Sequence, residues 1–331
     1  MYGPRVVAAL KVVAEATGWI CGKRLKAALP DLVPALEREG ALQLSEDVKG
    51  QLLEMSAATI DRKLSEARRR ARPKGISTTK PGSLLKRQIP VRVYTPWDEE
   101  HPGFVEIDLV AHCGESTAGE HLWTLDVTDI ATGWTELEPV LGKGQAAVFT
   151  ALKLIRSRLP FPLLRIDSDN GSEFINAHLY RYCEQQKLTF TRGREYHKDD
   201  QAHVEQKNYT HVRQLVGYDR YEGEQALQQF RRIYELARVQ HNLYLPAMKL
   251  VAKERQGAKV TKRYDEPKTP FKRAVEAGVI PSEQQLQLQG LMKRTGPMTL
   301  KRQLDQELGQ LWAMAASQPA AGTKAASVKA G

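Results

Sequence analysis

The feature that most constrains the fold is a short apolar segment ending in an acidic turn, within the sequence RIDSDNGSEF at residues 165–174. Residues 163–166 (LLRI) predict a buried strand, which Asn170-Gly171 ends. Ser172 is a favourable N-cap, so we expect a helix to begin there. A carboxylate at the end of that strand, Asp169, can face a crevice.

Two further segments carry acids in comparable settings. In residues 104–110 (FVEIDLV) the apolar side chains alternate with Glu106 and Asp108, so the two acids share one face of a predicted strand. Glu205 begins a helical pattern and is predicted to share the face that packs inward. Tyr209, Val212 and Val216 follow it on that predicted face. We therefore expect three carboxylates from separate segments to meet at one sheet edge.

These residues, in this order, resemble the DDE transposases and integrases of the retroviral-integrase superfamily, in particular the transposases of bacterial insertion sequences. The matching acids are Asp108, Asp169 within SDNGSEF, and Glu205, with 35 residues between the last two. The resemblance covers roughly residues 100–220 well. It implies a mixed-sheet α/β catalytic core of the ribonuclease H-like fold.

The resemblance also implies the chemistry. Asp108, Asp169 and Glu205 would act as the catalytic residues and would hold two Mg²⁺ ions, for which Mn²⁺ substitutes, because hard cations prefer oxygen ligands. Asp108 would bridge both ions. Water would cut the transposon strand, and the freed 3′ hydroxyl would attack target DNA in the same site. Transposon ends and target DNA are the expected partners, and pairing of two ends implies a homo-oligomer.

Each acid also has a structural alternative. Asp-Asn-Gly is ordinary turn chemistry, and Asp167, two positions before Asp169 on the same face, competes with it. Glu205 fits an ordinary acid in the first turn of a helix. We interpret four other acids as turn or surface residues and assign no catalytic role to two histidines. These residues are Asp126, Asp129, Asp199, Asp200, His197 and His203.

The net charge of +10 is concentrated in one tract. Residues 62–92 hold eleven Lys and Arg residues against Glu66 alone, which favours contact with phosphates over a merely solvated linker. The tract follows two short helices with a tight turn, residues 46–54 and those after Ser56, which resemble a helix-turn-helix but also fit a plain helical bundle. The candidate DNA-binding residues are Thr59, Arg62, Lys63, Arg68, Arg69, Arg70, Lys207, Asn208 and Arg213.

Composition shifts divide the chain into five predicted parts. An all-α, helix-turn-helix-like domain occupies residues 1–72, with helical pieces that Pro30 and Gly40 are expected to break. A basic, Pro-rich linker follows at 73–102, then the catalytic core at 103–245. A basic and helical appendage is expected at 246–316, and the Ala/Gly/Ser/Lys-rich end at 317–331 is predicted to be disordered.

Other function classes fit the sequence less well. Three cysteines, Cys21, Cys113 and Cys183, form neither a disulfide framework nor a zinc pattern, so the N-terminal zinc module of retroviral integrases is missing. No apolar run approaches a membrane span and no signal peptide is evident, which indicates a bacterial cytoplasmic, nucleoid-associated protein. Two alternatives stay open: a nuclease of the same fold without strand transfer, and a non-catalytic DNA-binding regulator.

Overall fold

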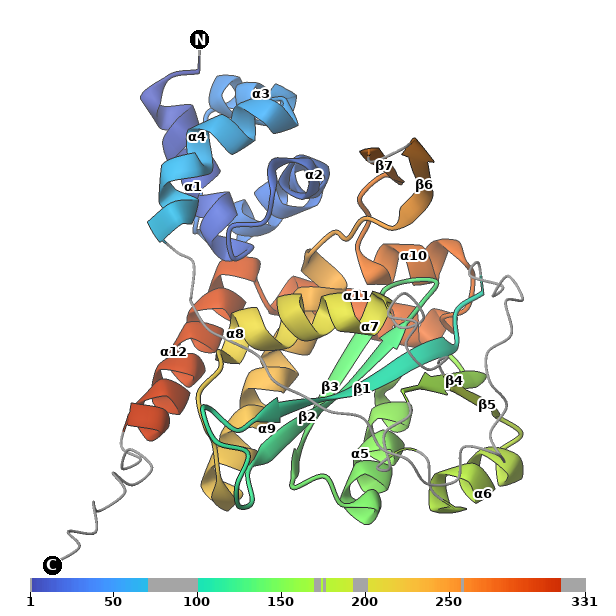
Figure 1. Ribbon diagram of the computed structural model, residues 1–331. Coiled ribbons are helices and arrows are strands. Elements are labelled where there is room, and N and C mark those ends of the chain that lie inside the picture. The colour runs from blue at the N-terminus through green and yellow to red at the C-terminus, as the bar shows by residue number, and fades with distance from the viewer. Residues whose placement is uncertain are drawn as a thin grey trace, which may run out of the picture.

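The computed structural model describes residues 2–70, 101–169, 174, 177–192, 202–256 and 259–316. A five-stranded mixed sheet in the order β3-β2-β1-β4-β5 forms its centre (Figure 1). The strands are β1 (Phe104–His112), β2 (Leu122–Asp129), β3 (Thr135–Leu141), β4 (Arg165–Ser168) and β5 (Thr189–Arg192). The first three strands form an antiparallel meander, whereas β4 and β5 run parallel to β1. This topology confirms the ribonuclease H-like mixed-sheet prediction.

Helices cover both faces of the sheet. On one face, Val105, Ile107 and Leu109 pack in a core with α5 (Gln145–Arg158). On the other face, Val110 packs in a second core with α9 (Gly223–Val239). Because both faces are covered, Glu106 and Asp108 lie beneath a helix layer rather than in open solvent. The remaining elements of this part are α6 (Ala177–Gln185), α7 (Ala202–Lys207), η2 (Asn208–Arg213), α8 (Gln214–Val216) and η3 (Gln240–Tyr244).

Four helices form an N-terminal head: α1 (Pro4–Ala16), α2 (Gly22–Arg38), α3 (Glu46–Glu54) and α4 (Ala57–Arg70). Ser56 caps α4, since its Oγ accepts a hydrogen bond from the Thr59 N–H at 3.2 Å. The predicted break at Pro30 is wrong, because α2 runs through both Pro30 and Pro34. Its apolar stripe is almost fully buried, and that packing outweighs the backbone hydrogen bonds that the prolines lack.

The C-terminal part contains a hairpin that the sequence did not reveal. Its elements are β6 (Leu250–Gln256), β7 (Lys259–Tyr264), α10 (Pro270–Glu276), α11 (Ser282–Arg294) and α12 (Pro297–Ala316). The three helices agree with the predicted helical appendage, and the leucine stripe of α12 is buried. The basic segment before them pairs as an antiparallel hairpin instead. Its closely spaced charges obscured the alternation that identifies a strand.

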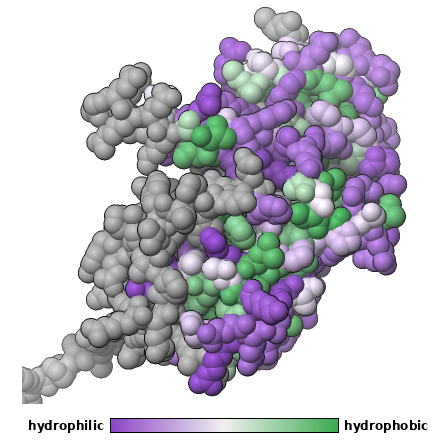
Figure 2. Space-filling view, turned by 90° about the vertical axis from the view of Figure 1, so that its right-hand side faces the viewer, coloured by the Kyte–Doolittle hydropathy of each residue, from purple (hydrophilic) through white to green (hydrophobic). Residues whose placement is uncertain are grey.

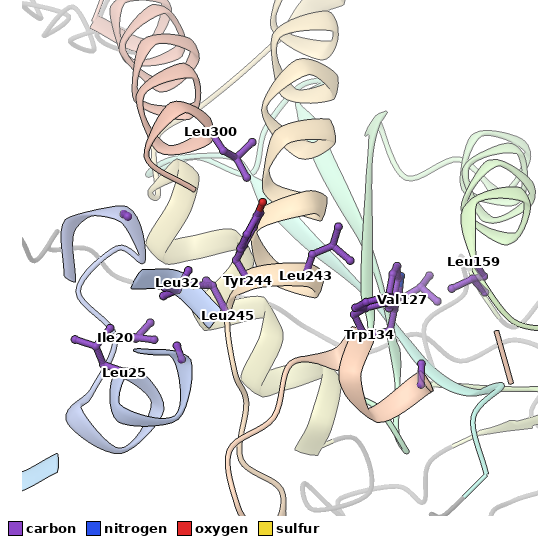
Figure 3. Packing of buried hydrophobic residues seen from close by; sticks show 14 of the residues in the cluster. Ile20, Leu25, Leu32, Val127, Trp134, Leu159, Leu243, Tyr244, Leu245 and Leu300 are labelled. Atoms are coloured by element: carbon purple, nitrogen blue, oxygen red, sulfur yellow. The ribbon is translucent and has the colours of Figure 1, made fainter. Parts of the chain in front are cut away.

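One hydrophobic core runs from the head to the sheet. It contains Leu25 and Leu32 of α2, Tyr244 of η3, Leu300 of α12 and Trp134 beside β3 (Figure 3).

The predicted borders between the head, catalytic core and appendage stay predictions. Residues 73–100 of the predicted linker and the predicted disordered tail lie outside the described residues. No helix of the described part is both long and apolar enough to cross a membrane.

Candidate active site

Asp108 and Asp169 lie on neighbouring parallel strands. Asp108 is in the middle of β1, and Asp169 is the first residue after β4. The register pairs Ile107 with Ser168, so the two acids are the next positions along the paired strands. Because paired positions on adjacent strands point to the same face, the sheet itself brings these carboxylates together.

Glu205 is positioned by a second acid of β1. The carboxylate of Glu106 is buried, and its Oε2 accepts hydrogen bonds from the N–H groups of His203 and Val204 at 3.0 and 2.9 Å. These N–H groups belong to the first turn of α7, which has no intrahelical partners for them. Glu106 therefore fixes the start of α7 against β1, and Glu205 is the next residue along that helix.

The electrostatics of Asp108 link all three acids. Burial, together with the negative charges of Asp169 and Glu205, raises the pKa of Asp108 to about 7, so both acids lie within electrostatic reach of Asp108. The described residues contain no group of three His, Cys, Asp or Glu side chains already placed to ligate one metal ion. The three acids therefore influence one another electrostatically without forming a closed ligand shell.

Two hydrogen bonds orient the Asp108 carboxylate. Its Oδ1 accepts from the Leu109 N–H at 2.8 Å, and its Oδ2 accepts from the side-chain amide of Asn208 at 2.6 Å. Asn208 was predicted to contact DNA, but its amide donates to Asp108 instead. Both donors stabilise the ionised form of Asp108 and lower its pKa, opposing the effect of burial.

Two sequence interpretations near the site are wrong. Asp126 was interpreted as a turn or surface acid, but it lies within β2 directly opposite Asp108 and is fully buried. Burial raises its pKa to about 8, although the Thr128 hydroxyl donates to it. Lys207 was predicted to contact DNA, but it is buried as well, and burial lowers its pKa to about 8 while Asp126 raises it. Asp126 and Lys207 interact electrostatically, so each side chain partly offsets the cost of burying the other.

The helix that carries Glu205 changes its pitch. The segment η2 is a π-helix, whose wider turn shifts the faces of the helix by about one residue. Val212 and Val216 are fully buried as predicted, whereas Tyr209 is 55% exposed and Glu205 is exposed. The prediction that Glu205 shares the inward face is therefore wrong. Glu205 lies on the solvent-exposed side of α7, and the neighbouring Val204 is the residue of this turn that is buried.

The competing acids have structural partners. Asp167 is fully buried and accepts a hydrogen bond from the Thr191 hydroxyl at 2.6 Å, which links β4 to β5. Asp129 does close a turn as predicted, by accepting from the N–H and hydroxyl of Thr132, but it is buried rather than exposed. His203 is half-buried. His197, Asp199 and Asp200 lie outside the described residues.

The candidate DNA-binding residues of α4 divide into two groups. Arg62, Lys63 and Arg69 are exposed, and Thr59 is half-buried beside Arg62, with which it forms a hydrogen bond. Arg68 points inward instead, where it donates to the carbonyls of Trp19 and Ile20 and pairs with Asp61. Its prediction as a DNA contact is wrong, because its guanidinium joins α4 to the loop between α1 and α2. The side chain of Arg70 lies outside the described residues.

Arg213, the remaining candidate, follows the active-site helix. It is half-buried, and its guanidinium lies over the ring of Tyr218 at 5.0 Å.

No protein-family model matches the sequence. The chain is 46% identical over 272 residues to the uncharacterized protein y4rM of Sinorhizobium fredii (strain NBRC 101917 / NGR234), an alignment that covers 82% of this chain and 78% of that protein.

Among solved structures, the catalytic core domain of BIV integrase is 16% identical, with a TM-score of 0.34, covering 53% of this chain and 95% of that domain. The catalytic core domain of HTLV-2 integrase, in complex with magnesium in a dimeric form, is 14% identical, with a TM-score of 0.34, covering 44% and 90%.

Proposed function

The chain belongs to the same family as the uncharacterized protein y4rM, and we propose that it is a DDE transposase that cuts DNA and joins the cut end to a target. The strongest support is that the negative charges of Asp169 and Glu205, which come from two other elements, both raise the pKa of Asp108. A buried carboxylate such as Asp108 is costly to ionise beside two other acids, and a bound cation would offset that cost.

The donor set fits two hard divalent cations. Asp108 of β1, Asp169 after β4 and Glu205 of α7 are the residues that would hold the ions. Carboxylate oxygens suit Mg²⁺ or Mn²⁺ and fit thiophilic metals poorly. A pair of such ions stabilises charge on both the attacking and the leaving oxygen of a phosphodiester.

The residues around the acids keep that donor set in place. Asn208 and the Leu109 N–H hold the Asp108 carboxylate in one orientation. Glu106 holds the start of α7 and thereby Glu205. The exposed Arg62, Lys63 and Arg69 of α4 supply positive charge for the phosphate backbone, which supports a DNA substrate. Because a transposon has two ends, we expect a homo-oligomer on chromosomal DNA in the bacterial cytoplasm.

Strand-transfer assays with pre-cut transposon ends test the function. We expect Asp108→Asn and Asp169→Asn to abolish Mg²⁺-dependent cutting and joining while DNA binding is retained. Asp219→Asn, which removes an exposed carboxylate elsewhere, is the control and should leave both steps intact.

Other outcomes of these assays separate the alternatives. Cutting without joining by the wild-type chain would indicate a nuclease. Cutting that survives both substitutions would reject the assignment of the acids.

A further inference from the structure

A cleft of about 370 Å³ lies between the head and the β6–β7 hairpin. Lys23 of α2 and Ala57, in the first turn of α4, line one wall. Lys262, Arg263 and Tyr264 of β7 line the other. Segments about 200 residues apart in the sequence thus form one concave surface, at the position in Figure 1 where the hairpin approaches the head.

Helix α2 is hydrogen-bonded to the elements on both sides of this cleft. The Gly22 N–H donates to Asp61 Oδ1 at 2.7 Å, which ties α2 to α4. A Cβ at Gly22 would lie 2.2 Å from the Ala57 carbonyl oxygen, so only glycine permits this approach. On the other side, the largely buried Arg24 donates to the carbonyl of Pro246, shortly before the hairpin begins. The width of the cleft is therefore set by the same helix on both sides.

The base of the hairpin is also fixed. Asp265 Oδ1 accepts from the Lys249 N–H at 2.7 Å, and the Asp265 N–H donates back to the Lys249 carbonyl at 3.0 Å. Asp265 Oδ2 pairs with Arg273 of α10 at 2.7 Å. Because that ion pair neutralises Asp265, the charge that the cleft presents comes from exposed Lys23, Lys262 and Arg263.

Further positive charge lies on α4, beyond the turn that lines the cleft. The N-terminal end of a helix carries a partial positive charge, and the first turn of α4 faces the cleft. Arg62 and Lys63, both exposed, follow on the same helix. Figure 2 shows that the face of the molecule on this side is predominantly hydrophilic. A cationic surface built from a helix and a two-stranded ribbon matches the regularly spaced charges of a nucleic-acid duplex.

We propose that this cleft binds the sugar–phosphate backbone of duplex DNA, so that the β6–β7 hairpin and α4 hold the same duplex. The proposal rests on the proposed function, since it assigns a surface to the DNA that the active site would cut. It gives the C-terminal hairpin a role in DNA binding, and it couples the head to the core through the bound duplex as well as through packing. Exposed Tyr264 adds a hydroxyl donor beside the two cations.

Fluorescence anisotropy with a labelled, random-sequence DNA duplex tests the proposal on the full chain. The test variant is Lys262→Ala/Arg263→Ala. The matched control is Lys11→Ala/Arg302→Ala, which removes the same charge from exposed positions on α1 and α12. We expect the test variant to bind roughly tenfold more weakly, with a slope of log Kd against log salt that is smaller by about 2, one unit for each lost phosphate contact. The control variant should bind like the wild type.

Each other outcome overturns the proposal. Equal binding by the wild type and the test variant would show that the cleft does not hold DNA, and equal weakening of both variants would show only a general effect of charge. A duplex of RNA whose binding is lost in the test variant while DNA binding is retained would assign the cleft to RNA. These results are separate from the proposed function, because the strand-transfer activity of the wild type measures that function independently.

Discussion

We expect Asp108 to govern how the proposed site responds to pH and to divalent cations. Its pKa in the folded chain is raised to about 7 from an ordinary value near 3.8, so ionising it costs folding free energy. This cost is absent below the pKa of the unfolded chain, grows as the pH rises between the two values, and is constant above the folded value. A bound cation would offset it.

Thermal unfolding in EDTA measures the cost of ionising Asp108. Asp108→Asn removes the ionisable group, so we expect its melting temperature to exceed that of the wild type by a margin that widens between about pH 4 and pH 7. Adding Mg²⁺ at pH 8 should raise the melting temperature of the wild type and leave that of the variant unchanged. A margin that is independent of pH would contradict the raised pKa.

Asn208 is the residue that orients Asp108, and its effect can be measured separately. Asn208→Ala removes the 2.6 Å hydrogen bond to Asp108 Oδ2. We expect the Mg²⁺ concentration for half-maximal cleavage to rise about tenfold to a hundredfold, which is typical of lost second-sphere contacts. Gln206→Ala, at an exposed neighbouring position, is the control. An unchanged Mg²⁺ requirement in Asn208→Ala would reject the orienting role.

The sequence correctly placed Asp108 within a strand and Asp169 at the end of a strand, but it did not predict the exposure of Glu205 or the surroundings of the acids. The acids follow from strand ends and spacing, which are local patterns. The pairing of Asp126 with Asp108 depends on the register of two antiparallel strands, and the burial of Lys207 depends on helix packing over them. Neither relation is encoded in a short window of sequence.

At the scale of the element, α7 depends on Glu106 for its start. Glu106→Ala leaves the N–H groups of His203 and Val204 without their acceptor, so we expect a loss of stability of about 1–2 kcal/mol and a large fall in cleavage as Glu205 loses its position. Glu106→Gln keeps one carbonyl oxygen as acceptor and should retain most of the stability. Denaturant unfolding and cleavage assays measure both effects. If Glu106→Ala and Glu106→Gln lost the same stability and the same cleavage activity, the capping role of Glu106 would be excluded.

Most strands and helices of the core carry a strong apolar period, but two predicted boundaries are shifted. The strand expected at 163–166 is β4 at Arg165–Ser168, and Phe174 lies in a turn before α6 begins at Ala177, although a helix was expected from Ser172. Two other differences share a physical cause. The π-helix after Lys207 and the prolines within α2 are local costs that tertiary packing outweighs, so sequence propensity alone places them wrongly.

At the scale of the whole molecule, the continuous core predicts cooperative unfolding. Leu32 of α2 is buried near Tyr244 and Leu245, which connect the head to the sheet (Figure 3). We expect Leu32→Ala, at a cost of about 2–5 kcal/mol, to lower a single thermal transition of the whole chain. Calorimetry checks this. Two separate transitions, with only the earlier one shifted, would show that the head and core unfold independently.

Anomalous scattering from a Mn²⁺-soaked crystal will show whether Asp108, Asp169 and Glu205 hold divalent cations together. We expect anomalous peaks beside β1 and β4, within ligand distance of oxygens of Asp108 and of the other two acids. Mn²⁺ bound elsewhere, or the three carboxylates turned apart with no peak between them, would contradict this expectation.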